Sequence, residues 1–296
     1  MHPPSDFRGG PESVRPVFQR LKKYGFNIIF PFVKYDDGSV FFPTAEEDVP
    51  VAMQEWGVSP VEIMVKEARE AGLKVHPVFV IFCEGTFKGW DKPSEPGPWL
   101  SKNLELAQVD KNGKPILRWA CPAGEEVRRH EASLILEVVK KYDVDGVQLD
   151  YIRYPEEGFG CYCERCRGKF KEEQGIDPMD IKELDHRMAR WLDWRARSIT
   201  TFIQDLKRNI KQIKGNVALS AAVFKDYPSC FFQHGQDWVD WCDKGLMDFV
   251  CPMTYEFHTK IARYRARAHR TAVGKETIIY EGLGKGSSQS ILTPEA

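Results

Sequence analysis

The segment DGVQLDYIRYPEEGFGCYCERCRGKF, residues 145–170, carries the strongest structural and chemical signals in this sequence. It begins as a short apolar run that is typical of a buried parallel strand and ends in the carboxylate of Asp150. Tyr151 and Arg153 follow directly, and a cluster of cysteines comes soon after. A carboxylate at the end of a buried strand is costly unless it has a purpose, so the pattern indicates a functional site. The alternative is that Asp150 pairs with Arg153 and only orders the loop.

Five more apolar runs of strand length occur along the chain, at residues 26–33, 73–82, 217–224, 247–255 and 276–284. Amphipathic helical patterns separate the runs, and this alternation predicts either a (β/α) barrel or an open doubly wound sheet. The barrel is favoured because polar residues collect at the C-terminal end of nearly every run, where the catalytic groups of such barrels lie. Six strands are two fewer than a closed barrel contains. We therefore expect one TIM (β/α)8-type barrel domain over residues 1–296, in a fragment that lacks the first and last strands.

The helices between these runs have clear start and stop signals. A capping box with proline at the first helical position begins a helix at residues 59–62, and Gly72 is expected to end it. The apolar face over residues 127–139 predicts a helix that leads directly into the Asp150 strand. A longer pattern over residues 180–215 predicts a helix with an extra turn or a break, and the basic segment 260–270 predicts a solvated outer helix.

Residues 84–122 form an insert after the second run, and a cysteine-rich loop is expected at residues 155–170. An Asn-Gly pair between two β-prone arms of the insert predicts a surface hairpin. The insert also contains Trp90, Trp99 and Trp119. These rings could stack on sugars if the insert folds over the barrel mouth, or they could simply pin the insert to the barrel.

Carboxylates, tyrosines and hydroxyl groups gather at the expected strand ends. Such a set suits cleavage of glycosidic bonds, in which one carboxylic acid protonates the leaving oxygen and a second carboxylate attacks or activates water. Asp150 is the principal candidate, and we expect Glu281 or Glu256 to be its partner. Glu281 could instead cap a neighbouring helix, and Glu256 could be a solvent-facing loop residue. His76 lies inside an apolar run, where a histidine is more often a hydrogen-bonded core residue.

Cys161, Cys163 and Cys166 lie too close together for ordinary disulfides, and three such thiolates are most simply metal ligands. Tetrahedral zinc requires a fourth ligand, and Cys121 could reach this loop because it begins the helix that enters the Asp150 strand. We expect a structural zinc ion at these four cysteines. An iron–sulfur cluster is the alternative, but the spacing and position differ from those of radical enzymes that use S-adenosylmethionine.

The bulk properties exclude several classes of protein. The net charge of −1 gives no electrostatic reason to expect a nucleic acid or an anionic membrane as a partner. No apolar stretch approaches the roughly 20 residues of a membrane span, no Gly-rich phosphate loop is present, and no organic cofactor is expected. A metal-dependent amidohydrolase would need a His-x-His at a strand end, and none of the seven histidines supplies one. Localisation stays open: cytoplasmic if the N-terminus is native, secreted or periplasmic if a signal peptide is missing.

Six segments, in order over almost the whole chain, also resemble the glycosyl hydrolase-like family 10 barrels, among them VDGVQLDYIRYP (144–155), DFVCPMTY (248–255) and IIYEGLG (278–284). The resemblance implies a glycoside hydrolase that acts on a poly- or oligosaccharide through paired carboxylates at the C-terminal face of the barrel. We expect the sugar to be bound by Tyr151, Arg153, Tyr154, Tyr255, His76 and Trp90. A non-catalytic carbohydrate-binding barrel is the alternative, and it would lack a facing pair of carboxylates.

The cysteine pattern has a second likeness. WACP (119–122) followed by CYCERCRGKF (161–170) is similar to the structural zinc site of family 42 β-galactosidases. In that family an Asn-Glu pair at the end of the fourth strand supplies the acid/base, whereas Tyr151-Ile152 occupies those places here. That catalytic scheme is therefore not implied, and Asp150 instead resembles the strand-four aspartate of other barrel glycosidases.

Overall fold

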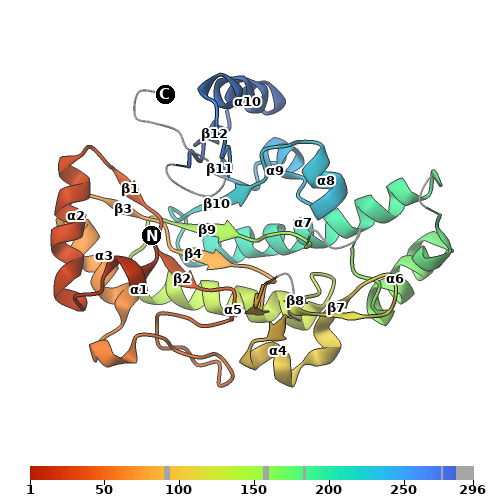
Figure 1. The fold of residues 1–296 in the computed structure, drawn as a ribbon, viewed down its shortest axis with the longest axis horizontal. Coiled ribbons are helices and arrows are strands. Elements are labelled where there is room, and N and C mark those ends of the chain that lie inside the picture. The colour runs from red at the N-terminus through yellow and green to blue at the C-terminus, as the bar shows by residue number, and fades with distance from the viewer. Residues whose placement is uncertain (90–93, 156–159, 183–184, 275, 285–296) are drawn as a thin grey trace.

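A computed structural model describes residues 1–89, 94–155, 160–182, 185–274 and 276–284 (Figure 1). Its centre is a six-stranded parallel sheet in the order β12-β11-β10-β9-β4-β2. The strands are β2 (Phe32–Lys34), β4 (Val78–Val80), β9 (Gly146–Asp150), β10 (Ala218–Val223), β11 (Phe249–Pro252) and β12 (Ile278–Ile279). All six expected strands are therefore confirmed, and so is the α/β class.

Two of the expected strands are each divided in the structure. The short strands β1 (Ile28–Ile29) and β3 (Lys74–Val75) pair with each other, in parallel, ahead of β2 and β4. Pro31 separates β1 from β2, and Pro77 separates β3 from β4. Proline has no N–H to donate to a neighbouring strand, so each proline interrupts the ladder.

The order of the strands in the sheet repeats their order in the chain. A doubly wound sheet reverses its order at a switch point, so that alternative fold is wrong. A parallel sheet in which each new strand is added on the same side, in chain order, is typical of the wall of a (β/α) barrel. Among the described residues the sheet stays open, with β2 and β12 at its two edges, and no closed barrel is observed.

The expected helices are present around this sheet as α3 (Pro60–Glu70), α5 (Glu125–Lys141), α7 (Met188–Ile213) and α10 (Thr259–Ala272) (Figure 1). The helices α2 (Val14–Lys23) and α9 (Trp238–Asp243) were not predicted. The hydroxyl of Ser59 accepts a hydrogen bond from the amide of Glu62, as the capping box predicts. The long helix α7 runs without interruption, and the break predicted over residues 180–215 lies before it, after the short turn η4 (Pro178–Asp180).

Smaller elements complete the fold. Near the N-terminus these are α1 (Pro3–Asp6), η1 (Pro11–Ser13) and η2 (Gln54–Trp56), and after β9 and β10 come α6 (Glu164–Gln174) and α8 (Ser229–His234). The insert contains β5 (Gly85–Thr86), β6 (Glu95–Pro96), α4 (Pro98–Lys102), η3 (Leu104–Leu106), β7 (Ala107–Val109) and β8 (Pro115–Ala120). The strands β7 and β8 pair in antiparallel fashion, which confirms the expected hairpin.

The insert is fastened to the C-terminal end of β4. The amide of Ala120 donates to the carbonyl of Phe82, and the amide of Glu84 donates to the carbonyl of Arg118, both at 2.8 Å. Through these bonds, the residues that directly follow β4 pair with residues of β8. The insert therefore lies beside the strand ends, where the candidate site was expected.

The inner face of the sheet can be recognised from β9. Gly146, Gln148 and Asp150 alternate onto one side of this strand. A Cβ added to Gly146 would lie 2.2 Å from the ring of His76, and Gln148 accepts a hydrogen bond from Ser220 on the neighbouring strand β10. Asp150 consequently lies on the same face, at its C-terminal end.

His76 is a core residue of this inner face. Its ring packs against Phe30 and Phe249 at centroid distances of 5.5 and 5.4 Å, and burial lowers its pKa to about 4. It lies beside Gly146, four residues before Asp150, which corresponds to about 13 Å along the strand. The assignment of His76 to substrate binding is therefore wrong, because the chain places it toward the opposite end of the sheet.

Candidate functional site

Asp150 closes strand β9 and is half-buried. Its carbonyl accepts a hydrogen bond from the amide of Ile81, which directly follows β4, and its Oδ1 accepts one from the amide of Tyr151, both at 2.8 Å. Tyr151 has a φ of +55°, a left-handed conformation that turns the chain sharply away from the strand. Burial raises the pKa of Asp150, although the Tyr151 amide and the positive charge of Arg153 act in the opposite direction.

Arg153 and three aromatic rings form a wall beside Asp150. The guanidinium of Arg153 lies 4.7 Å from the ring centroid of Tyr151, 4.8 Å from that of Phe224 and 5.3 Å from that of Trp119. The rings come from the end of β9, the end of β10 and the insert, so three separate parts of the chain meet here. Such a wall combines cation–π contacts with flat apolar faces, on which sugar rings can stack.

Tyr255 is the second expected sugar-binding tyrosine near this wall. It follows β11 and is half-buried, and burial together with the carboxylate of Asp150 raises the pKa of its phenol. Tyr154 is different, because its side chain is completely buried and its ring lies 5.2 Å from the guanidinium of Arg195. The assignment of Tyr154 to the sugar site is thus wrong. Trp90, a further expected contact, lies outside the described residues.

Glu281 follows strand β12, and its side chain is 19% exposed. Its Oε1 lies 2.9 Å from Nδ1 of His269, and its Oε2 accepts a hydrogen bond from the hydroxyl of Thr254. Burial raises the pKa of the Cys251 thiol on β11, and the negative charges of both Glu281 and Asp150 act in the same direction. Glu281 therefore joins Asp150 among the groups around the C-terminal end of β11.

Sequence reasoning missed His269. The basic helix α10 was expected to be a solvated outer helix, and most of its residues are exposed or half-buried, but His269 is only 3% exposed. The available signal was its position in the last turn of a helix that runs directly into the strand of Glu281. Nothing in the local sequence states that its ring points toward that strand.

Glu256 forms ion pairs with two cations. Lys225 Nζ lies 2.8 Å from its Oε1, and Arg265 donates to the same oxygen while also contacting Asp226. Burial alone would raise the pKa of Glu256, but the hydrogen bonds from Lys225 and Arg265 outweigh it and lower the pKa. These ion pairs join the loops after β10 and β11 to helix α10, so Glu256 has a structural role in holding these segments together.

The structure brings the four cysteines together. Cys121 Sγ lies 3.3 Å from Cys166 Sγ and 4.0 Å from Cys163 Sγ, and all four sulfurs, including that of Cys161, lie within 4.8 Å of one another. Four thiolates about 2.3 Å from a tetrahedral metal ion would be about 3.8 Å apart, so the spacing fits. All four are buried, and the amide of Val109 donates to Cys161 Sγ at 3.4 Å. Hydrogen bonds from the other three cysteines, Cys121 foremost, hold the pKa of Cys163 far below its usual range.

The cysteine group joins three parts of the chain. Cys121 directly follows the hairpin strand β8, Cys161 lies in the loop after β9, and Cys166 lies in the first turn of α6. The amide of Tyr162 also donates to the carbonyl of Val109 on β7, at 2.7 Å. A metal ion held by these residues would fasten the insert, and with it the aromatic wall, to the loop that leaves the Asp150 strand.

A buried ion cluster lies at the ends of β2 and β4. Lys34 Nζ lies 2.5 Å from Glu84 Oε1 and 3.2 Å from Glu131 Oε2, and none of the three side chains is more than 1% exposed. His130 Nε2 is 3.7 Å from Glu84, and Trp99 of the insert stacks on the His130 ring at 3.8 Å. Trp99 therefore pins the insert, which was one of the two roles expected for its tryptophans.

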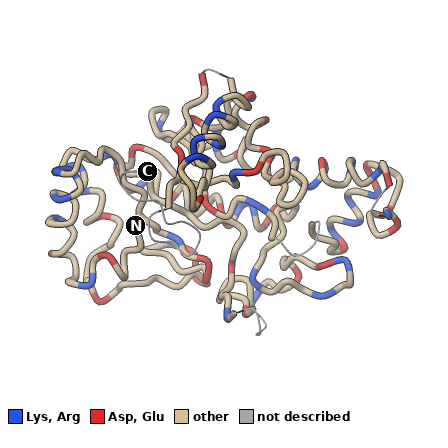
Figure 2. The backbone as a smooth tube through the Cα atoms, turned by 45° about the horizontal axis from the view of Figure 1, so that its top comes forward, with Lys and Arg blue, Asp and Glu red and all other residues tan. Residues whose placement is uncertain are grey.

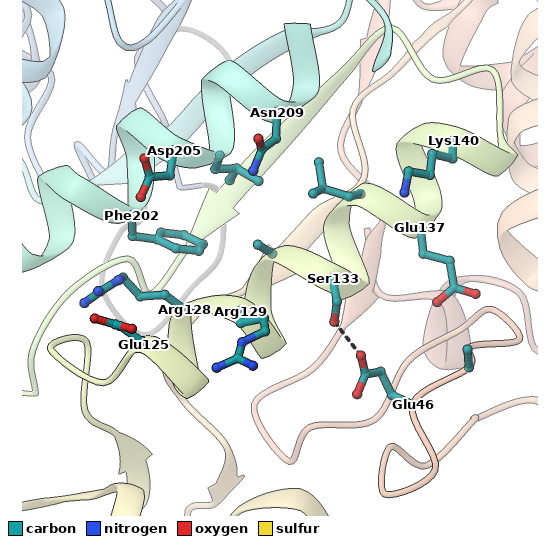
Figure 3. A pocket seen from close by; sticks show the side chains of 14 residues that line it. Glu46, Glu125, Arg128, Arg129, Ser133, Glu137, Lys140, Phe202, Asp205 and Asn209 are labelled. Carbon is teal, nitrogen blue, oxygen red and sulfur yellow. Dashed lines mark hydrogen bonds between the residues drawn. The ribbon is translucent and has the colours of Figure 1, made fainter. Parts of the chain in front are cut away.

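A hollow of about 880 Å³ lies on the outer side of the molecule, between α5 and α7 (Figure 3). Leu136 and Phe202 form part of its apolar lining, and at its rim Ser133 donates a hydrogen bond to Glu46 at 2.7 Å. None of the residues that line it belongs to the expected site. This hollow is therefore a feature of the helix layer, separate from the strand ends.

Charge does not distinguish a nucleic-acid-binding or membrane-binding face. Figure 2 shows lysine and arginine interspersed with aspartate and glutamate throughout the described chain, in keeping with the net charge of −1. Among the described helices, none combines the length and apolar character that crossing a membrane requires.

A family model described as "Glycosyl hydrolase-like 10" matches residues 10–287. The chain belongs to this family. Among curated proteins, it is similar to the glycosyl hydrolase DigH of Escherichia coli (strain K12), with 24% identity over 293 residues that cover 89% of this chain. The match covers 62% of DigH, so the chain spans less than two thirds of the length of that relative.

Two solved structures share the fold. A β-galactosidase from Rahnella sp. R3 superimposes with a TM-score of 0.69 and 16% identity, covering 99% of this chain and 46% of that one. The glycoside hydrolase domain of PgaB (BpsB) from Bordetella bronchiseptica gives a TM-score of 0.67 and 11% identity, covering 91% and 78%. At these identities the likeness extends to the fold alone. The chain thus belongs to a glycosyl hydrolase-like family and shares its fold with solved glycoside hydrolases.

Proposed function

We propose that this protein is a glycoside hydrolase that cleaves a poly- or oligosaccharide with Asp150 and Glu281 as its two carboxylates. The observation that carries the proposal is the half-buried Asp150 on the inner face of a parallel sheet, at the C-terminal end of β9. Catalytic groups of barrel enzymes occupy this place, and the chain belongs to a glycosyl hydrolase-like family and shares its fold with solved glycoside hydrolases.

The environments of the two carboxylates differ in the way that glycoside cleavage requires. Burial raises the pKa of Asp150, so this group is suited to hold the proton that it would give to the leaving oxygen. Both oxygens of Glu281 have hydrogen-bonding partners, Thr254 and His269, as the oxygens of an ionised carboxylate do. Glu281 is therefore suited to the role of nucleophile or base.

The aromatic wall supports a carbohydrate as the substrate. The half-buried Tyr151, Arg153 and Phe224 could contact sugar rings next to Asp150, with Tyr255 nearby and the buried Trp119 backing Arg153. A barrel that bound sugars without cleaving them would use the same wall but would not need the proton of Asp150.

Two finer features belong to this proposal. The six strands in chain order form the larger part of an eight-stranded (β/α) barrel, whose remaining strands would close the sheet between β12 and β2. The metal at Cys121, Cys161, Cys163 and Cys166 is zinc, since four buried thiolates are a typical ligand set for a structural zinc ion. With all four positions filled by protein, this ion would stabilise the loops and take no part in the reaction.

The test is hydrolysis of a panel of 4-nitrophenyl glycosides and of purified polysaccharides, followed by release of nitrophenol or of reducing ends. Asp150→Asn should lower the rate by about 10²–10⁴-fold, the usual contribution of a general acid. Glu281→Gln should have an effect of similar size, whereas Glu256→Gln, the matched control, should reduce the rate much less. Sugar binding without turnover by the unmodified protein would instead support the non-catalytic carbohydrate-binding barrel.

A further inference from the structure

His269 is the one buried histidine whose ring joins a candidate catalytic carboxylate. It lies in the last turn of α10, 3% exposed, with its ring edge against Trp238 of α9 at a centroid distance of 5.8 Å. Its Nδ1 is 2.9 and 3.2 Å from the two oxygens of Glu281, and its Nε2 is 2.7 Å from the carbonyl oxygen of Lys225. A single ring thus connects the residues after β10 and β12 with helix α10.

The hydrogen-bonding partners constrain the protons on this ring. The Lys225 carbonyl can only accept, so Nε2 must carry a hydrogen. Nδ1 faces Glu281, whose Oε2 already accepts a hydrogen bond from the Thr254 hydroxyl. If Glu281 is ionised, it accepts from both neighbours, and hydrogens are then required on both ring nitrogens. The contacts fit an imidazolium bound to a carboxylate.

The charges around the ring agree with this state. Burial would lower the pKa of His269, but the hydrogen bond to Glu281, the Lys225 carbonyl and the charge of Glu281 together raise it, against a smaller opposing effect of Arg265 on the same helix. The amino group of Lys225 is itself paired with Glu256, and Thr254 and Trp238 carry no charge. The carboxylate of Glu281 is the partner that holds the charge on the ring.

We propose that His269 is a positioning residue that stays protonated, keeps Glu281 ionised and fixes its orientation relative to the ends of β10 and β11. This inference rests on the proposed function, in which Glu281 acts as nucleophile or base. An ionised carboxylate at a fixed position is what either role needs. Without His269, Glu281 would lose one of its two hydrogen-bond donors and its nearest positive charge.

The first test needs no substrate. In ¹⁵N-histidine-labelled protein, the two ring nitrogens of His269 are assigned from the signals that disappear in His269→Gln. We expect a titration midpoint above 6.5, with both nitrogens mostly protonated at pH 6. In Glu281→Gln the midpoint should fall below 6.5, because burial is then opposed only by the Lys225 carbonyl. A midpoint below 6.5 in the unmodified protein, or the same midpoint in Glu281→Gln, would overturn the proposal. His258→Gln, which changes an exposed histidine at the N-cap of the same helix, is the control and should leave the His269 signals unchanged.

The second test separates positioning from a merely structural role. For a 4-nitrophenyl glycoside that the unmodified protein hydrolyses, kcat should fall by more than about tenfold in His269→Gln while KM changes little, since a misplaced catalytic group can cost about 10²-fold in rate. An unchanged kcat would contradict the positioning role. If the unmodified protein hydrolyses none of the glycosides, the proposed function fails, while the titration of His269 still decides whether the ion pair exists.

Discussion

Replacing Lys34 by methionine should remove several kcal/mol from the free energy of unfolding, because two buried carboxylates depend on this one cation. Lys34 Nζ contacts Glu84 at 2.5 Å and Glu131 at 3.2 Å, and it donates a hydrogen bond to the Val80 carbonyl at 2.7 Å. The side chains of Lys34 and Glu131 are 0% exposed, and that of Glu84 is 1% exposed. Water therefore cannot replace the missing charge.

The magnitude follows from the pKa of Glu84. Burial alone would raise this pKa, but Lys34 and, to a lesser extent, His130 lower it from 4.5 to about 2. At 1.36 kcal/mol for each pKa unit, the difference corresponds to roughly 3 kcal/mol. Since the folded pKa lies below the unfolded one, this stabilisation is fully present above about pH 4.5 and is lost as the pH falls toward 2. Loss of one partner of a buried ion pair typically removes 3–5 kcal/mol, which agrees in size.

Glu131 partly limits the loss. Burial raises its pKa to about 7 despite Lys34, with the charge of Glu84 acting in the same direction. In Lys34→Met this carboxyl can take up a proton near neutral pH, so we expect a loss near 3 kcal/mol at pH 7 and a smaller loss at pH 4, where Glu84 also begins to protonate. A double variant that adds Glu84→Gln should recover part of the loss.

Urea unfolding followed by circular dichroism measures both values. Lys66→Met, on the exposed side of α3, is the matched control and should change the free energy of unfolding by less than about 0.5 kcal/mol. A loss below 1 kcal/mol in Lys34→Met at pH 7, or an equal loss at pH 4 and pH 7, would refute the reasoning.

Three other perturbations test the metal site, the candidate acid and the sheet interior. Cys166→Ser should abolish stoichiometric zinc in the purified protein by elemental analysis, whereas Cys242→Ser, a buried cysteine outside the cluster, should retain it. Arg153→Met removes a charge that lowers the pKa of Asp150, so the alkaline limb of the glycosidase pH profile should move to higher pH; an unmoved limb would argue against Asp150 as the acid. Gly146→Ala should lower the melting temperature and the free energy of unfolding by more than 1 kcal/mol, because the added Cβ would lie 2.2 Å from the inner-face imidazole; unchanged melting would contradict the packing.

The six strands, the main helices and the hairpin were predictable because their signals are local. Continuous apolar runs mark strands that are covered on both faces, and the capping residues at 59–62 mark a helix start wherever the helix later packs. The cysteine cluster was predictable for the same reason, since three of its members lie within residues 161–166. Asp150 was identified by its place at the end of such a run.

The sequence could not show in which direction a polar side chain points. Tyr154 lies four residues after Asp150, yet its ring is buried against Arg195 instead of joining the sugar site. The apolar residues on either side of His76 in the sequence do not show at which end of the sheet it lies. In the structure His76 lies beside Gly146, about 13 Å along β9 from Asp150. The orientation of Tyr154 depends on the left-handed turn at Tyr151, and the position of His76 depends on strand register. Neither feature can be read from the local sequence.

The sequence by itself determined the secondary structure, the α/β class and the group of cysteines, because each depends on residues that are close in the chain. Only the tertiary structure decided which polar groups meet. Lys34 pairs with Glu131, 97 residues away, and the His269 ring bonds the carbonyl oxygen of Lys225, 44 residues away. Long-range contacts of this kind arise from topology, and many other partners would satisfy the same local pattern.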